Sequence, residues 1–348
     1  MYSEFELIQY IKQLFPTAEG VTVGIGDDGA VLDPGRFDLV TTDTMVEGVH
    51  FDRAWSSPQD IGWKAIASNL SDIAAMGGGP GVILLNLVLP RGVARGEVEG
   101  LLEGMKLAME ALIPQSFQVS LAGGDLTSTR GPMMISVTLL GESSPAGPVL
   151  RQGAVPGDRV IMLGCLGMSA AGLELFRQGV HLSDPLEDYT RTLLDYHRRP
   201  SPRIYEGAIL GLYGVPSAMI DVSDGFLQDL GHIVASSHVG AFIETHGMPR
   251  HAAVTEFGQR HGYDRDALLT LMLTGGEDYE LLFTVPPARM PKLWELARRY
   301  DWDVYDIGEV RSPEEGIRLI GPDGQPMALP DVAGFTHDFS ERVGESDG

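Results

Sequence analysis

The sequence predicts a mixed α/β protein of two domains, because strand-like apolar runs alternate with helix-like periodic segments along its 348 residues. A chain of this length can bury more than one hydrophobic core. A segment rich in proline, glycine and serine at residues 143–158 interrupts the alternation. We therefore expect an N-terminal domain over residues 1–147, a C-terminal domain over residues 148–340 and a flexible tail over residues 341–348.

Four apolar runs in the first half of the chain predict strands. Their sequences are DLVTTD, GVILLNLVLP, FQVSLAGGD and MMISVTLLGE. The periodic segments between them predict helices over about residues 57–76 and 92–113. Ser57 is a favourable N-cap, Pro58 suits the first helical turn, and glycines at 77–79 end the first of these helices.

The second half of the chain predicts a longer series of strands and helices. The strand candidates are DRVIMLG, SAMIDVSDG, GAFIETH, YELLFTVP and VYDIGEV. Helices are expected from about residue 168, near residues 185–196, near residues 202–213 and at about residues 225–238, with one more between the last two strands.

Composition excludes several classes of protein. The net charge of −23, from 48 acidic and 25 basic residues, argues against a nucleic-acid partner. Apolar runs are too short to span a bilayer, and the acidic N-terminus MYSEFELIQYIKQLF does not resemble a signal peptide, so we expect no membrane partner. The single cysteine, Cys165, excludes an internal disulfide and a cysteine-built zinc site, and it fits a cytoplasmic protein.

Several acidic residues share one setting, a glycine turn or the end of a strand-like run. They are Asp27 and Asp28 in GIGDDGAV, Asp43 in TTDTMVEGVHF, Asp72 in NLSDIAAMG, Asp125 in LAGGDLTS, Asp221 and Asp224 in IDVSDGFLQDL, and Glu277 and Asp278 in GGEDYELLF. Asp43 and Asp125 are expected at the C-terminal ends of strands, where α/β sheets usually place ligands. Helical spacing puts Asp72 on the face of Ile61 and Ala65, where an unpaired carboxylate is costly.

Dispersed carboxylates with neighbouring hydroxyls suit hard cations such as Mg²⁺. One Mg²⁺ usually takes one or two carboxylates, so this many acids predict several ions, or ions shared with a polyphosphate. The chain has no G-x-x-x-x-G-K-[ST] loop, and none of its four lysines lies in a glycine loop. A bound phosphate would therefore be neutralised by metal ions and an arginine, for which Arg151 in VLRQGA is the candidate.

Each motif also has a purely structural interpretation. GDDG and SDG commonly form turns, and Asp72 can be satisfied by a neighbouring backbone N–H. His50 in EGVHF can be a packing histidine, Glu277 and Asp278 can form an acidic hairpin, and Cys165 fits a small buried residue. Because about six such motifs would have to coincide, a shared site is the stronger interpretation.

In this order, GIGDDGAV, TTDTMVEGVHF, NLSDIAAMGG, LAGGDLTS, IDVSDGFLQDL and GGEDYELLF resemble the thiamine-monophosphate kinase family. The resemblance covers essentially the whole chain, from about residue 4 to GFTHDF at residues 334–339. It implies a two-domain aminoimidazole ribonucleotide synthetase-like fold and a homodimer formed through the N-terminal α/β domains. It also implies ATP-dependent phosphorylation of thiamine monophosphate to thiamine diphosphate with Mg²⁺.

The resemblance further implies roles for individual residues of this chain. Metal ligands would be Asp27, Thr41, Thr42, Asp43, Asp72, Asp125, Asp221 and Asp224. ATP contacts would be Gly124, Asp125, Arg151 and Ser223, and thiamine phosphate contacts would be His50, Glu277 and Phe335. Phe339 is a second aromatic residue in the same tail. The family often has an aromatic residue near the adenine where this chain reads LLEGMKLAME, so the adenine contact stays open.

The implied chemistry needs no general base, because the attacking phosphate oxygen is already ionised near neutral pH; transfer is expected to be direct. In the wider superfamily, selenophosphate synthetase needs a cysteine near the N-terminal glycine motif, and the hydrogenase-maturation dehydratase needs one at the C-terminus. Cys165 is in neither place. Another ATP-using superfamily member, such as aminoimidazole ribonucleotide synthetase, or a non-catalytic nucleotide-binding homologue is the alternative.

Overall fold

The expected α/β architecture is present. The computed structural model describes residues 10–16, 21–23, 31–32, 35 and 37–336. Asp27, Asp28 and Phe339 lie outside the described residues. Within the described part, residues 10–14 are helical, and strands β1 (Val21–Val23) and β2 (Val31–Leu32) form a small antiparallel pair.

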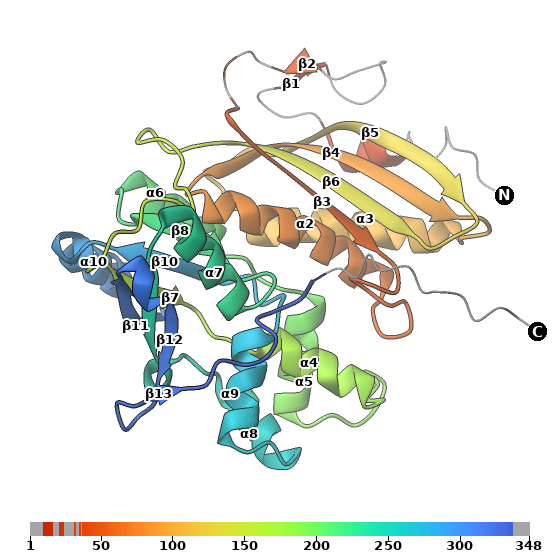
Figure 1. The fold of residues 1–348 in the computed structure, drawn as a ribbon. Helices are drawn as coiled ribbons and strands as arrows, with labels where there is room; N and C mark the ends of the chain where they lie inside the picture. The colour runs from red at the N-terminus through yellow and green to blue at the C-terminus, as the bar shows by residue number, and fades with distance from the viewer. Residues whose placement is uncertain (1–9, 17–20, 24–30, 33–34, 36, 337–348) are drawn as a thin grey trace, which may run out of the picture.

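Four strands form the sheet of the N-terminal half. They are β3 Leu39–Val46, β4 Gly79–Pro90, β5 Ser120–Thr129 and β6 Met134–Glu142. Their order is β3-β6-β4-β5, with parallel pairing between β4 and β5 and antiparallel pairing elsewhere. Helices α2 (Pro58–Ala75) and α3 (Arg95–Leu112) cover one face of this sheet (Figure 1). Because only one face of the sheet is covered by helices, buried and exposed side chains alternate along β3: Leu39 and Met45 are buried, whereas Val40 is 68% exposed.

Seven strands form the sheet of the C-terminal half. They are β7 Arg159–Leu163, β8 Ala218–Asp221, β9 Gly240–Glu244, β10 Leu281–Val285, β11 Val304–Arg311, β12 Ile317–Ile320 and β13 Pro326–Met327. The order is β13-β12-β9-β11-β7-β10-β8, and β9 and β12 are the parallel pair.

Helices surround this second sheet (Figure 1). They are α4 Met168–Arg177, α5 Asp188–Arg198, α6 Ile204–Leu212, α7 Phe226–Ser237, α8 Ala252–Arg260, α9 Arg265–Thr274 and α10 Met290–Tyr300, with short 3₁₀ segments η1 Thr245–Gly247, η2 Pro287–Arg289 and η3 Pro313–Glu315. Among the helices of the described residues, none combines the length and apolar character that a bilayer span requires.

Strand β7 contributes to two hydrophobic cores, one on each face of the second sheet. Ile161 and Leu163 belong to a core that continues into α2, α3 and the first sheet. Val160 and Met162 belong to a second core with residues of α4, α5, α7, α8 and α9. This two-sided burial explains why DRVIMLG is continuously apolar, and it joins the two halves of the chain through one core.

Three expectations about the elements need correction. Asp43 and Asp125 lie inside strands rather than at their ends, because β3 continues to Val46 and β5 continues to Thr129. Both extensions are paired with neighbouring strands along their length. Helices α8 and α9 and strand β12 were not expected from the sequence.

The predicted start of α2 is confirmed, and the capping residues there also contact the end of α5. Ser57 and Asp60 form a reciprocal capping box, in which the Ser57 backbone N–H donates to Asp60 Oδ2 at 3.1 Å. The Asp60 side chain is 1% exposed and forms ion pairs with Arg198 and Arg199 at the end of α5. One buried carboxylate therefore caps one helix and anchors another.

We expect Asp60→Ala to lower the free energy of unfolding by about 3 kcal/mol or more, because it removes a cap and strips two guanidinium groups of their buried partner. Denaturant unfolding measures this loss. Asp195→Ala is the matched control, since Asp195 is an exposed partner of Arg198, and it should cost less than about 1 kcal/mol. Equal losses in both variants would contradict the assignment.

Candidate active site

Three aspartates meet beside α2, where it packs against β3 and β8 (Figure 1). Thr41 Oγ1 on β3 donates a hydrogen bond to Asp72 Oδ2 on α2. One residue earlier on the same helix, Ser71 Oγ donates to Asp221 Oδ2 at 2.7 Å. Asp43 follows Thr41 by two residues, so it faces the same side of the sheet. The structure thus brings together acids that are far apart in the sequence.

Burial raises the pKa values of all three aspartates, and the charge of Asp72 adds to this effect at Asp43 and Asp221. Burial, then the charges of Asp72 and Asp224, raise the pKa of Asp43 to about 6, against a hydrogen bond with Ser68. Burial raises the pKa of Asp72, opposed by Thr41. Burial and then the charge of Asp72 raise the pKa of Asp221 well above its ordinary value. Such an arrangement is unfavourable unless a cation or protons compensate it.

Arg151 supplies positive charge to this cluster. Its guanidinium acts to lower the pKa values of both Asp72 and Asp221. Backbone contacts fix its loop, because the Leu150 carbonyl accepts from the backbone N–H of Met219 at 3.0 Å and the Arg151 carbonyl accepts from Ser237 Oγ at 3.2 Å. One cation beside three carboxylates leaves a net negative site of hard oxygen donors, which fits Mg²⁺.

The turn from Ser223 to Gly225 is organised by Asp229, which sequence reasoning missed. Asp229 Oδ2 accepts three backbone hydrogen bonds, from Ser223 at 3.1 Å, Asp224 at 3.2 Å and Gly225 at 3.1 Å. Asp229, Asp224 and His232 also place possible ligand atoms within 4.8 Å of one another. Because three donors already hold Asp229, its evident contribution is to aim Asp224. An acidic residue in the first turn of α7 was the available signal.

The loop that contains Glu277 adjoins the turn from Ser223 to Gly225. Glu277 and Tyr279 have φ angles of 65° and 52°, in the left-handed region that is unfavourable for such residues. Backbone hydrogen bonds to Ser223 and Val222 hold both of them there. Between them, Asp278 is fully buried and accepts backbone hydrogen bonds at the start of α4, so the GGED segment is not a solvated acidic hairpin.

Glu277 and His50 lie close together through Lys64 of α2. Lys64 Nζ is 2.6 Å from Glu277 Oε1 and donates to the carbonyl oxygen of His50 at 3.0 Å. His50 Nδ1 accepts from the backbone N–H of Val46 at 3.1 Å. Burial acts to raise the pKa of Glu277, but the ammonium group of Lys64, its ion-pair partner, outweighs burial and the pKa is lowered. Glu277 is therefore an ionised carboxylate.

Phe335 reaches the site through its backbone. Its N–H donates to the carbonyl oxygen of Asp224 at 2.9 Å. Gln228 Nε2 donates both to Asp224 Oδ2 at 3.0 Å and to the Phe335 carbonyl at 2.9 Å. The Phe335 residue remains 47% exposed. The chain near residue 335 is thereby fastened to the turn that carries Asp224.

The structure separates Thr42, Gly124 and Asp125 from the acid cluster within one chain. Thr42 Oγ1 is hydrogen-bonded to Thr138 Oγ1 at 3.0 Å, on the opposite face of the sheet from Thr41. Asp125 lies on β5, at the far edge of the sheet from β3. Asp125 pairs with Asn86, which pairs with Ser136, which in turn pairs with Thr44, so the side chains of these four residues lie on one face of the sheet. Asp43 precedes Thr44 on β3 and therefore lies on the opposite face.

Gly124 has a structural reason to be glycine. Its φ angle is 153°, and a Cβ atom there would lie 1.8 Å from the carbonyl oxygen of Leu85. Close pairing with β4 therefore accounts for the glycine without a ligand.

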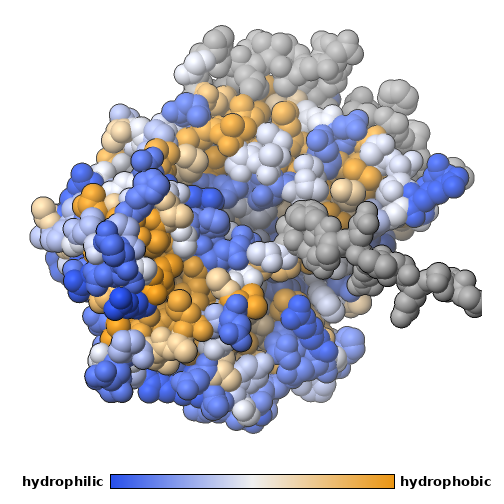
Figure 2. All heavy atoms as spheres, viewed as in Figure 1, coloured by the Kyte–Doolittle hydropathy of each residue, from blue (hydrophilic) through white to orange (hydrophobic). Residues whose placement is uncertain are grey.

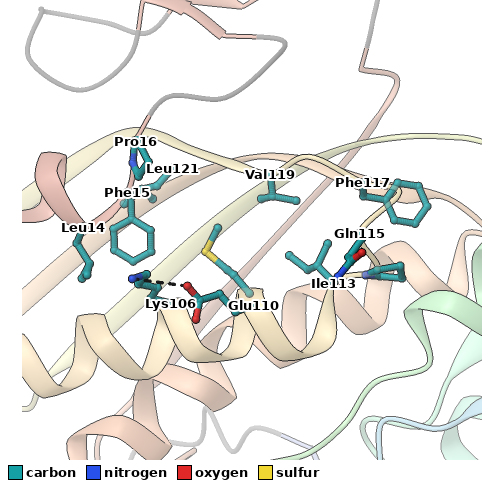
Figure 3. A pocket seen from close by; sticks show the side chains of 12 residues that line it. Leu14, Phe15, Pro16, Lys106, Glu110, Ile113, Gln115, Phe117, Val119 and Leu121 are labelled. Carbon is teal, nitrogen blue, oxygen red and sulfur yellow. Dashed lines mark ion pairs between the residues drawn. The ribbon is translucent and has the colours of Figure 1, made fainter.

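A separate pocket lies between α3, the segment 14–16 and the start of β5, as Figure 3 shows. Apolar residues of α3, its following loop and the segment 14–16 line it, together with an ion pair of Lys106 and Glu110 at 3.5 Å. It contains none of the described residues of the predicted site. Figure 2 instead shows hydrophilic residues in the middle of the visible face, where α7 approaches the four-stranded sheet.

Two family models match the chain in succession. "AIR synthase related protein, N-terminal domain" matches residues 26–143, and "AIR synthase related protein, C-terminal domain" matches residues 155–320. The thiamine-monophosphate kinase of Salmonella typhimurium is 38% identical over 339 residues, which are 96% of this chain and 98% of that protein. The chain belongs to the thiamine-monophosphate kinase family.

Solved structures of thiamine-monophosphate kinases share the fold. The crystal structure of the enzyme from Stenotrophomonas maltophilia K279a has a TM-score of 0.80 and 34% identity, covering 93% of this chain and 98% of that chain. A structure described as AaThiL complexed with AMPPCP and TMP has a TM-score of 0.73 and 32% identity, covering 96% and 97% of the two chains. The resemblance expected from the motifs is therefore confirmed at the level of the family and of the fold.

Proposed function

We propose that the protein transfers the γ-phosphoryl group of ATP to thiamine monophosphate, which yields thiamine diphosphate and ADP. The observation that carries this proposal is the buried cluster of Asp43, Asp72 and Asp221 in a chain of this family. It is supported by the similarity to the thiamine-monophosphate kinase of Salmonella typhimurium and to the related structure that was solved with AMPPCP and TMP.

Mg²⁺ is the ion that we propose for the cluster. Its ligands would be Asp43, Asp72, Asp221 and Asp224, with Thr41 beside them and with Asp27 from the part of the chain that is not described. Bound Mg²⁺ neutralises phosphate oxygens, so that two polyanions can approach each other in an acidic protein. The number of carboxylates favours several ions rather than one.

Both substrates would lie against the acids. Arg151 and Ser223 would contact ATP, since both lie next to the cluster on the side of α7. His50, Glu277 and Phe335 would contact thiamine monophosphate. The ionised Glu277 suits the cationic thiazolium ring of that molecule, and the exposed aromatic ring of Phe335 can stack on it.

The residues of this chain would bind and orient rather than exchange protons. Burial lowers the pKa of His197, the histidine next to Glu277, to about 3, so this imidazole stays neutral. The acceptor phosphate is ionised near neutral pH and needs no base. Direct transfer between two aligned phosphates therefore fits the site, without a phosphorylated protein intermediate.

We also propose a homodimer in which Gly124 and Asp125 complete the site of a second copy. Three inter-strand spacings, about 14 Å, separate β5 from β3 within one chain. A residue at that edge can join the acids of β3 only if another copy supplies it. A second copy would also cover the outer face of the first sheet, which exposes Val40. A cytoplasmic location fits the use of ATP and the single free cysteine.

The test is product formation by the purified protein with ATP, Mg²⁺ and thiamine monophosphate. We expect thiamine diphosphate and ADP in equal amounts, no turnover of thiamine or of aminoimidazole-pathway substrates, and complete loss with EDTA that excess Mg²⁺ reverses. ATP binding without thiamine diphosphate would favour a non-catalytic homologue. Turnover of an aminoimidazole-pathway substrate would favour another member of the superfamily.

A further inference from the structure

We propose that Lys64 is a positioning residue for the acceptor substrate, because its ammonium group holds Glu277 and the His50 segment in one fixed arrangement. This inference rests on the proposed function, in which Glu277 and His50 contact thiamine monophosphate. Lys64 itself is not placed in contact with either substrate. It would act through the two groups that it joins.

The environment of Lys64 differs from that of the other lysines. The chain has four, and Lys12, Lys106 and Lys292 are exposed or partly exposed. Lys64 is 4% exposed, near the middle of α2. A buried ammonium group is costly unless strong partners compensate it, so this position calls for a specific explanation.

Both partners of Lys64 belong to the acceptor side of the site. Nζ is 2.6 Å from Glu277 Oε1 in the C-terminal half and 3.0 Å from the carbonyl oxygen of His50 in the N-terminal half. The two contacts come from segments more than two hundred residues apart in the sequence. Lys64 therefore fixes a distance between two binding groups that no local structure sets.

While Lys64 is present, its neighbour His197 is not an ion-pair partner of Glu277. His197 Nδ1 is 3.5 Å from Glu277 Oε2, but burial lowers its pKa to about 3 and it also hydrogen-bonds Ser169 Oγ at 2.9 Å. The backbone of Glu277 is held in the left-handed region by its hydrogen bond to Ser223. Without the ammonium group, the carboxylate would keep its backbone position but lose the partner that lowers its pKa and sets its direction.

The experiment is steady-state kinetics of Lys64→Met with each substrate varied in turn. We expect the KM for thiamine monophosphate to rise about tenfold or more, while the KM for ATP and kcat stay within about twofold. Arg151 and the aspartates are held by other contacts, which is why the ATP side should not change. Equal changes in both KM values, or a loss of kcat alone, would overturn the proposal in favour of general structural support.

Two further variants keep the test decisive. Lys64→Arg retains the positive charge but presents its donors differently, so it should fold if the methionine variant does not, and it should show the same selective rise in the KM for thiamine monophosphate. Unchanged kinetics in a folded Lys64→Arg variant and in Lys64→Met would overturn the proposal. Lys106→Met on α3, which removes a partly exposed lysine, should change neither KM. Failure of the wild-type protein to form thiamine diphosphate would instead refute the proposed function.

Discussion

Asp43→Asn is expected to reduce kcat/KM for thiamine diphosphate formation about a thousandfold or more, because it removes one of the three clustered carboxylates that are proposed to bind Mg²⁺. Coupled detection of ADP, with direct detection of thiamine diphosphate, measures the loss. High Mg²⁺ concentrations should restore little activity, since an amide oxygen carries no net charge to replace the missing carboxylate.

The same variant should be at least as stable as the wild type in metal-free buffer at pH 8. Burial and the charge of Asp72 raise the pKa of Asp43 to about 6, so the ionised carboxylate destabilises the folded state above its unfolded pKa. The neutral amide avoids this cost, and the difference should vanish near pH 4. Thermal unfolding checks both statements. Asp301→Asn, at an exposed position with a φ angle of 57° that asparagine also tolerates, should alter neither activity nor stability.

Mixed dimers are expected to recover activity that Asp43→Asn and Asp125→Asn each abolish alone. In a dimer of one chain of each kind, one site would carry both substitutions and the other would carry neither. A purified heterodimer with two different affinity tags should therefore show about half of the wild-type activity per dimer. The physical reason is the position of Asp125, on the far edge and the opposite face of the sheet from Asp43.

Two outcomes would contradict this arrangement. Full activity of the Asp125→Asn homodimer would show that Asp125 is not part of the active site. Inactive homodimers with an equally inactive heterodimer would place Asp125 and Asp43 in one copy, against the separation that the strand order imposes. Size-exclusion chromatography with light scattering must show a dimer in each case, so that a loss of association is not mistaken for a loss of the site.

The sequence predicted those features that depend on neighbouring residues. The cap of α2 follows from Ser57 and Pro58, and the strands β4, β6, β7 and β10 follow from their apolar runs. The grouping of Asp43, Asp72 and Asp221 was expected from their motifs. In each case a short window already contains the physical cause.

The sequence could not predict features that depend on distant partners. A lysine within a helix normally faces solvent, so nothing in its neighbourhood marks Lys64 as buried against Glu277. Asp278 accepts hydrogen bonds from Gly167 and Ser169, more than a hundred residues away. Position across a sheet is likewise a property of strand order, so the LAGGD motif could not reveal that Asp125 lies far from Asp43.

Helix α2 and the inner face of β7 share one hydrophobic core. The segment at residues 143–158 therefore divides the sequence into two halves but does not allow the two halves to move independently. Ile161 and Leu163 lie on one side of that boundary and pack into the core of the other. A hinge motion about the linker would have to open this apolar contact, so large domain closure is not available to the protein. For the same reason, recombining halves from different relatives would require matched residues on both sides of the shared core.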